Sequence, residues 1–199
     1  YNKIGKLTGR GNYNGNKDES SDVYTSVGKR SGLWEWWYDN GKIKHQRKYT
    51  EKGELIFKKE YYQENSQLKE EENWKYGEKD GVWKFYDKNG QLDKEVNWKN
   101  GNKHDRFKSN YENGQVREEG NLVNDKREGL FKSWYENGQL KRTGNFKDGE
   151  REGLFKWWYE DGKLKEEGSY LIKKLKYFKT YRKKGIWKSY YENGKLKEE

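Results

Sequence analysis

The chain has 199 residues, a net charge of +10, and no cysteine, methionine or proline. The lack of cysteine excludes disulfides, thiol chemistry and metal sites built on sulfur, and no apolar run approaches the length of a membrane-spanning helix. Valine, isoleucine and leucine together number only 24, against 10 Trp, 17 Tyr and 7 Phe, so we expect a folded protein that buries aromatic rings, because disordered chains are poor in them.

A turn-forming sequence recurs along the chain at a nearly constant interval. Its central residue stands at eight places: Gly5, Gly41, Ser66, Gly90, Gly114, Gly138, Gly162 and Gly194. The usual interval is about 24 residues, which lies in the range of repeat architectures. We therefore predict a single repeat array over residues 1–199. Such arrays typically present a surface to a partner.

Three segments depart from the repeat. Residues 16–27 form a polar insertion that we expect to be an exposed loop. Lys58 to Ser66 lacks the turn glycine, which predicts a wider turn. A second insertion, at residues 171–184, carries most of the charge: from Ser169 to Lys188 there are eight cations and no acid, which leaves only +2 for the rest of the chain.

The best-preserved units predict a β-hairpin. Asn137-Gly138 lies between aromatic and aliphatic residues, the strongest short signal for a two-residue type I′ turn. This turn places Tyr135 opposite Leu140. It also places three rings opposite glycines: Phe107 and Gly120, Phe131 and Gly144, and Phe155 and Gly168. A ring beside a glycine is a known way to fill a sheet surface, so the pairing is self-consistent.

A second turn closes each unit, as in Asn100-Gly101 and Asp148-Gly149. Two turns per unit predict an all-β protein, an elongated antiparallel meander of about eight tandem hairpins in a mostly single-layer twisted sheet. Such a sheet must cover its apolar side. We expect coiling first, with dimerisation or a partner chain as alternatives. Its open terminal edges could also accept an added strand.

Alternation along the strands sorts side chains onto two faces. The apolar face carries Phe131, Tyr135, Leu140, Gly144, Phe146 and their equivalents. The opposite side, called here the ladder face, pairs Lys84 with Glu95, Lys108 with Glu119, Lys156 with Glu167, and Lys188 with Glu199. Beside these pairs runs an aromatic stripe: Trp37, Tyr86, Trp134, Trp158 and Tyr190. Lys44, Lys141, Lys165 and Lys197 are expected opposite four stripe rings.

Two features are candidate binding sites. The aromatic stripe is either a self-supporting part of the sheet or a groove for a peptide or glycan. The basic insertion is either a solvated surface or a contact for anionic lipid, lipopolysaccharide or nucleic acid, the last being least favoured because the rest of the array is nearly neutral. Its cations are Lys173, Lys174, Lys176, Lys179, Arg182, Lys183 and Lys184.

No residue pattern indicates catalysis. His45 and His104 are the only histidines and lie in different repeats, and the predicted pairing sets Trp36, not an acid, opposite His45. Carboxylates are expected to pair with lysines, and no nucleophile or phosphate-loop motif occurs. We expect no enzyme activity, no metal and no cofactor.

The last unit is Gly185-Ile-Trp-Lys-Ser-Tyr-Tyr-Glu-Asn-Gly194-Lys-Leu-Lys-Glu-Glu199. It resembles the repeat of the bacterial MORN-repeat variant family, and similar units cover the chain apart from the two insertions. The resemblance implies tandem hairpins. The name YwqK-like antitoxin, used for such chains, implies binding and neutralising a toxin, whereas other MORN-type arrays imply membrane-associated scaffolds or surface accessory proteins.

We therefore expect a non-enzymatic repeat scaffold for protein–protein interaction, either a bacterial surface accessory or a toxin-neutralising protein. The alternative is a cell-envelope module that binds anionic lipid or glycan, because the Trp-Tyr-Tyr-x-Asn-Gly sequence is similar to that of choline- and glucan-binding repeats. Another protein is the first expected partner, with a homodimer as an alternative. A first residue of Tyr1 favours an exported protein, in the periplasm or on the cell surface, over a cytoplasmic one.

Overall fold

The structure is a computed structural model that describes the backbone of residues 9–14, 29–174 and 179–199, with side chains at 9–11, 29–171 and 183–199. Every element in these ranges is a β-strand, which confirms the all-β class. No helix in the described ranges is long and apolar enough to span a membrane. The turn predicted at Gly5 and the loop predicted at residues 16–27 lie outside the described residues.

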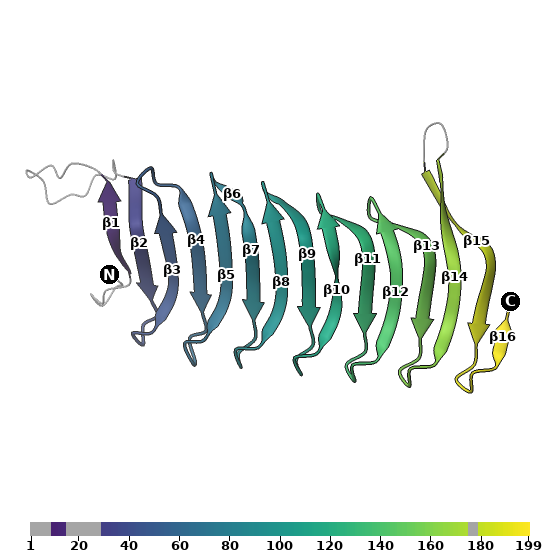
Figure 1. The fold of residues 1–199 in the computed structure, drawn as a ribbon. Coiled ribbons are helices and arrows are strands. Elements are labelled where there is room, and N and C mark those ends of the chain that lie inside the picture. Colours follow the sequence, from purple (N-terminus) through teal and green to yellow (C-terminus); the bar gives the residue numbers. More distant parts are fainter. Residues whose placement is uncertain (1–8, 15–28, 175–178) are drawn as a thin grey trace, which may run out of the picture. The chain divides into compact units, whose positions relative to one another are not determined.

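The strands follow one another in chain order in an open antiparallel sheet (Figure 1). They are β1 Gly9–Asn14, β2 Lys29–Trp37, β3 Ile43–Tyr49, β4 Leu55–Tyr61, β5 Leu68–Lys75, β6 Glu78–Lys79, β7 Gly81–Tyr86, β8 Leu92–Lys99, β9 Asn102–Asn110, β10 Val116–Val123, β11 Lys126–Trp134, β12 Leu140–Lys147, β13 Glu150–Trp158, β14 Leu164–Lys174, β15 Lys179–Tyr190 and β16 Leu196–Glu198. Among these strands only β6 lies outside the consecutive order, and it pairs with β5. The predicted antiparallel meander is confirmed.

Backbone contacts divide the chain into two compact units, which are described separately. The N-terminal unit comprises Tyr1–Gln91 and Trp98–Gly101, and the C-terminal unit comprises Leu92–Asn97 and Asn102–Glu199. Both units use the same hairpin. The C-terminal unit contains its most regular copies.

The Asn-Gly turn differs from the predicted type I′ turn. The N–H of Tyr135 donates to the Gln139 carbonyl at 2.8 Å, and the N–H of Gly138 donates to the Tyr135 carbonyl at 2.9 Å. Gly138 has φ of 84° and Asn137 keeps a negative φ, as in a three-residue type I loop with a glycine bulge. Asn137 Oδ1 accepts the N–H of Gln139 at 2.9 Å, so the asparagine side chain holds this loop and the type I′ prediction is wrong.

The extra residue in this loop shifts the pairing of the two strands beside it by one residue. Trp134 pairs with Leu140, while Ser133 pairs with Arg142, so Lys141 is an extra residue in β12. The predicted pairing of Tyr135 with Leu140 is therefore wrong. Because directly paired residues share a face, Leu140 belongs on the ladder face beside Trp134 and not on the apolar face.

Type I′ turns do occur, at the opposite ends of the strands. Asn100 and Gly101 have φ of 48° and 77°, and Asp148 and Gly149 have φ of 54° and 88°. Both central residues need positive φ in this turn, as observed. The wider turn predicted before Ser66 is confirmed, because the N–H of Ser66 reaches back to the Tyr62 carbonyl at 2.9 Å.

The predicted pairing of rings with glycines is confirmed for Phe107, Phe131 and Phe155. The ring that covers each glycine, however, comes from the following hairpin. A Cβ atom on Gly144 would lie 2.3 Å from the ring of Phe155, and one on Gly120 would lie 2.5 Å from that of Phe131. These glycines let successive hairpins interlock.

The apolar face is covered by cations, a solution that the sequence analysis did not foresee. Phe131 and Phe155 are 2% and 0% exposed in a cluster with Leu122 and Phe146. Arg127 Cζ lies 4.8 Å from the centroid of the Phe131 ring, and Arg151 Cζ lies 5.5 Å from that of Phe155. Equivalent cations cover other rings: Arg30 on Trp34, Lys79 on Trp83 and Lys183 on Trp187. Their apolar stems and cation–π contacts replace a second layer.

Candidate functional site

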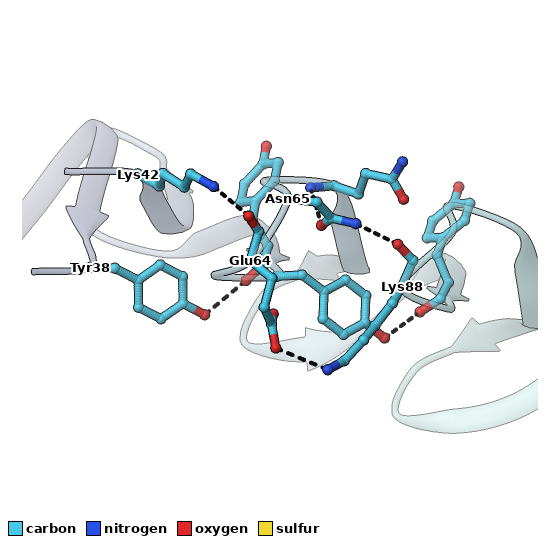
Figure 2. Close-up of polar contacts among 9 residues, drawn as sticks. Tyr38, Lys42, Glu64, Asn65 and Lys88 are labelled. Atoms are coloured by element: carbon cyan, nitrogen blue, oxygen red, sulfur yellow. Dashed lines mark hydrogen bonds and ion pairs between the residues drawn. The ribbon is translucent and has the colours of Figure 1, made fainter. Parts of the chain in front are cut away.

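A ladder of tyrosine hydroxyl groups joins consecutive hairpin loops. Figure 2 shows the contact in the N-terminal unit, where Tyr38 donates to the Tyr61 carbonyl at 2.8 Å. Tyr62 donates to the Tyr86 carbonyl at the same distance. The C-terminal unit repeats it: Tyr111 to Trp134, Tyr135 to Trp158 and Tyr159 to Tyr190, each at 2.8 Å. At the same place, Asp87 instead accepts the N–H groups of Asn89 and Gln91.

The loops also touch one another beyond the tyrosines. In Figure 2, Lys42 Nζ donates to the Glu64 carbonyl and Asn65 Nδ2 donates to the Lys88 carbonyl. The Glu64 carboxylate accepts from Lys88 Nζ at 2.9 Å, and this hydrogen bond holds the pKa of Glu64 below its usual value. The loop end of the hairpins is thus a seam in which side chains of one hairpin donate hydrogen bonds to backbone carbonyls of the next.

The predicted aromatic stripe lies directly beside this seam. Its five residues, Trp37, Tyr86, Trp134, Trp158 and Tyr190, are all partly buried. Four pair with an aliphatic residue of their own hairpin: Trp37 with Ile43, Trp134 with Leu140, Trp158 with Leu164, and Tyr190 with Leu196. Four also lend their carbonyls to the tyrosine ladder. These contacts give the stripe a role in joining hairpins.

The lysines predicted opposite the stripe lie elsewhere. Lys141 Nζ is 5.0 Å from the centroid of the Tyr135 ring, and Lys165 Nζ is 5.2 Å from that of Tyr159. Lys44 and Lys197 likewise lie over Tyr38 and Tyr191. The prediction is wrong because the extra residue of each loop shifts these lysines from the stripe to the ladder tyrosines.

Three of the four predicted Lys–Glu pairs are found, all within the C-terminal unit, and two of them are ion pairs. Lys156 Nζ lies 3.0 Å from a Glu167 carboxylate oxygen, and Lys188 Nζ lies 3.8 Å from one of Glu199. Lys108 pairs with Glu119 in the backbone register. Partly exposed pairs of this kind contribute roughly 0.2–1 kcal/mol each, so they set register more than stability.

The basic insertion extends a hairpin of the sheet. β14 and β15 continue past the neighbouring tight turns (Figure 1), with backbone pairs from Tyr170 and Lys183 up to Lys174 and Lys179. The side chains of Lys173, Lys174, Lys179 and Arg182, and all of Lys176, lie outside the described residues. Lys183 and Lys184 are exposed. Lys183 Nζ covers the Trp187 ring and lies 3.1 Å from Glu166, which leaves Lys184 as the described cation of this segment that faces the ladder side.

A glycine bulge recurs where most of the ring-bearing strands meet the preceding hairpin, although β9 has Asp105 at this place. Asn145 pairs with Glu152 and Gly144 pairs with Phe155, so β13 carries two extra residues, Gly153 and Leu154. Gly153 has φ of 73°. The same positive φ recurs at Gly32, Gly81, Gly129 and Gly185, each followed by an aliphatic residue and a ring. Glycine suits this conformation, and the bulge pushes the aliphatic residue outward.

Three bulge residues and two regular strand residues form a set of exposed aliphatic side chains, called here the aliphatic row, on the ladder face of the C-terminal unit. The row consists of Val123 on β10, Leu130 on β11, Leu154 on β13, Leu171 on β14 and Ile186 on β15, with exposed fractions of 39%, 49%, 50%, 46% and 65%. Val123 and Leu171 alternate with Leu122 and Tyr170 of the apolar face, while Leu130 and Leu154 pair with Asn145 and Ser169 of the next strand, which alternate with glycines of that face. Single exposed leucines are ordinary, but these five lie on one face of five strands, with Val123 and Leu171 two residues farther along their strands than the level of the other three.

The row ends at a shallow hollow of about 450 Å³. Its walls include Leu171 and Ile186 of the row, with Ser169, Lys184 and Glu152 around them. A hollow of this size accepts one or two apolar side chains of a partner. It is the place where the aliphatic row and the basic segment meet.

The N-terminal unit holds a different feature, a partly buried charge cluster. Lys58 Nζ lies 2.8 Å from Glu60 and 3.1 Å from Glu72, which is only 6% exposed. Burial, and then a hydrogen bond with Glu72, raises the pKa of Glu70 to about 7. A carboxyl group that shares its site with a second one is expected to retain its proton longer.

The histidines show no sign of a metal site. As the pairing predicted, His45 lies opposite Trp36, with ring centroids 4.4 Å apart. Burial, and then the nearby Arg47, lowers the pKa of His45 to about 4. Within the described ranges, no three His, Cys, Asp or Glu residues are arranged to hold a metal ion.

The sequence analysis missed the aliphatic row, although a signal for it was present. Gly-Leu-Trp, Gly-Val-Trp, Gly-Leu-Phe and Gly-Ile-Trp recur at the start of successive units. A glycine at a fixed place before a strand aromatic indicates a bulge. Assigning each strand to one uninterrupted alternation hid this signal.

Comparison with protein families identifies the repeat. The MORN repeat variant matches the chain at residues 30–51, 79–100, 106–124, 127–148, 151–171 and 183–199. Together these matches cover more than half of the chain, and each contains one hairpin loop of the tyrosine seam. No curated protein sequence matches the chain.

Proposed function

The chain belongs to the MORN repeat variant family, and from this premise we propose that it is a non-enzymatic scaffold whose ladder face binds another protein. Membership supports a repeat-based binding or scaffold role. The observation that carries the proposal is the aliphatic row, because Val123, Leu130, Leu154, Leu171 and Ile186 remain exposed while rings beside them, such as Phe131 and Phe155, are buried. Several exposed aliphatic side chains on one face support a contact with a partner.

The size of the row suits a specific but moderate contact. Burying a whole Leu or Ile side chain contributes about 1.5–3 kcal/mol, so five half-exposed ones offer about 4–7 kcal/mol. Association itself costs at least about 4 kcal/mol. The row is therefore an anchor, and a stable complex also needs polar contacts from Lys156, Lys188 or their neighbours on the ladder face.

Two more specific functions, toxin neutralisation and a role as a surface accessory protein, require different partners. A toxin-neutralising protein needs a toxin as its partner, and a surface accessory protein needs another envelope protein after export. We propose protein binding in both cases and no catalysis, because the sequence contains no motif of a known enzyme class. The second candidate, binding of anionic lipid or glycan, rests on the exposed Lys184 and the basic hairpin beside it.

The test is quantitative capture of partners from the native host. Leu130, Leu154 and Ile186 are changed together to Ser, and the control changes Glu136, Glu160 and Glu192, which lie in loops of the same hairpins, to Ser. We expect the wild type and the control to retain the same polypeptides and the aliphatic-row variant to lose them. Equal capture by all three proteins would refute the proposal. Binding to anionic vesicles that needs Lys184 but not the row would favour the second candidate.

A further inference from the structure

We propose that the aliphatic row binds a single amphipathic α-helix of the partner protein. The helix lies across the strands, and its acidic C-terminal end lies over Lys184. This inference rests on the proposed function and names the kind of partner segment that the row accepts.

The spacing of the row favours a helix. Leu130, Leu154 and Ile186 occupy the same place on alternate strands β11, β13 and β15, and alternate strands of an antiparallel sheet are about 9.6 Å apart. A helix rises about 10.5 Å over seven residues, so its positions i, i+7 and i+14 meet these three side chains in turn. In an extended strand, side chains on one face are about 6.6 Å apart, which does not match the spacing of about 9.6 Å between these row residues.

The remaining row residues fit the same helix. Val123 lies on β10, one strand before Leu130, and Leu171 lies on β14, between Leu154 and Ile186. One strand interval is about 4.8 Å, which lies between the rises of three and four helical residues. Both side chains are two residues, about 6.6 Å, farther along their strands than the other three, so they contact one side of the helix, at positions i−4 and i+10. Positions i−4 to i+14 make a helix of about 19 residues, about 27 Å long, which covers the roughly 24 Å from β10 to β15.

Charge gives the helix a direction. Near β11 to β13 the surroundings of the row are balanced: Lys147 pairs with Glu150 across the turn, and Glu128 accepts the N–H of Asp148. At the β14–β15 end, Lys184 lines the hollow with Glu152 as its one acid, and the sequence from Ser169 to Lys188 contains no acid. A helix C-terminus carries a partial negative charge, which acidic residues reinforce, so this end is drawn to Lys184.

The hollow between Leu171 and Ile186 supplies the anchor. It lies at the same end of the row as Lys184, so it receives the last apolar side chain of the helix, at i+14. A large aliphatic or aromatic residue there buries the most area at one point of the contact. Binding hot spots typically consist of such a side chain in a pocket, with charged groups at the rim.

Three synthetic helix-stabilised peptides test the inference against the full chain. The first has Leu at i, i+7 and i+14 and Glu in its last turn. The second moves the Glu residues to its first turn, and the third places the same Leu residues at alternate positions. Fluorescence anisotropy measures their affinities for the wild type, Leu154→Ser, Lys184→Glu and the loop control Glu160→Ser.

We expect the first peptide to bind best, with a loss of about tenfold for Leu154→Ser, since tenfold corresponds to the loss of roughly one buried side chain. Lys184→Glu should weaken the first peptide and remove its advantage over the second, while Glu160→Ser changes nothing. Equal binding of the first and third peptides, or binding of the first that ignores Leu154→Ser, overturns the inference. So does row-dependent dimerisation seen by sedimentation, since the row is then occupied by a second copy.

The two proposals fail in different ways. If no peptide binds but the aliphatic-row variant still loses its partner in the host, the helix is refuted and the protein-binding function stands. If the variant captures all that the wild type captures, the function itself is refuted, whatever the peptides do.

Discussion

The tyrosine ladder gives the sharpest prediction about stability. Tyr135→Phe removes one oxygen atom and leaves the ring in place beneath Lys141. The lost atom donates to the Trp158 carbonyl at 2.8 Å, and burial raises the pKa of the Tyr135 hydroxyl, as expected for a group withdrawn from water. Nothing else in the contact changes, so the substitution isolates a single hydrogen bond between consecutive hairpins.

The magnitude follows from the bond and its repeats. A hydrogen bond contributes about 0.5–1.5 kcal/mol net, and a carbonyl left without a partner adds to the loss if it stays buried. We expect the free energy of unfolding to fall by about 1 kcal/mol for Tyr135→Phe. Tyr111 and Tyr159 make the same bond to separate acceptors, so the triple variant should lose about 3 kcal/mol if the sites are independent.

Urea unfolding followed by tryptophan fluorescence measures these changes. Tyr191→Phe is the matched control, because Tyr191 holds the same place in its loop and is 51% exposed. The control should change the free energy of unfolding by less than about 0.5 kcal/mol. If Tyr135→Phe costs no more than Tyr191→Phe, or if the triple variant costs no more than one substitution, the ladder does not join the hairpins.

Three further predictions concern the packing and the charges. Gly144→Ala puts a Cβ atom 2.3 Å from the Phe155 ring and should lower the urea midpoint by the equivalent of about 2 kcal/mol, whereas Gly101→Ala, where the added atom meets nothing within 4 Å, should cost only its backbone strain. Arg151→Ala uncovers Phe155 and removes a hydrogen bond to the Tyr170 hydroxyl at 2.7 Å, so we expect calorimetry to show a loss of about 2 kcal/mol. Folding raises the pKa of Glu70 from 4.5 to about 7, so the folded state binds an extra proton between these values and stability falls as pH rises through them. Glu70→Gln should remove this fall. With a discount for solvent screening, we expect its free energy of unfolding to exceed that of the wild type by about 1 kcal/mol at pH 8 and to equal it near pH 4. A variant whose stability follows the wild type at every pH would contradict the shift, and Glu78→Gln, at an exposed position, is the control.

The meander and the pairing of rings with glycines were predictable because each repeat supplies the same evidence. Phe131 with Gly144 and Phe155 with Gly168 give one register twice. The loop type was not predictable from the turn alone. Asn-Gly favours a type I′ turn in an isolated hairpin, but Asn137 Nδ2 donates to the Glu160 carbonyl of the next loop at 3.0 Å. A contact between hairpins thus overrides the local preference.

The surface proposed as the binding site overlaps only in part with the candidate sites expected from the sequence. The sequence identified the ladder face and the basic hairpin, but it selected the Trp134 and Trp158 stripe, which pairs with leucines and joins hairpins. Exposure of Leu154 depends on a bulge that breaks the alternation on which the prediction relied. The cover of Arg151 over Phe155 depends on the reach of a long side chain, which register alone does not give.

Site-specific photo-crosslinking in host cells tests most directly whether the aliphatic row holds another polypeptide. A photoreactive phenylalanine analogue replaces Leu154 in one version of the chain and Glu160, in the neighbouring loop, in another. The account predicts a discrete adduct with a second polypeptide from position 154 only, and its loss when Leu130 and Ile186 are changed to Ser. The same adducts from both positions, or none from position 154 in cells where the chain captures its partner, would contradict it.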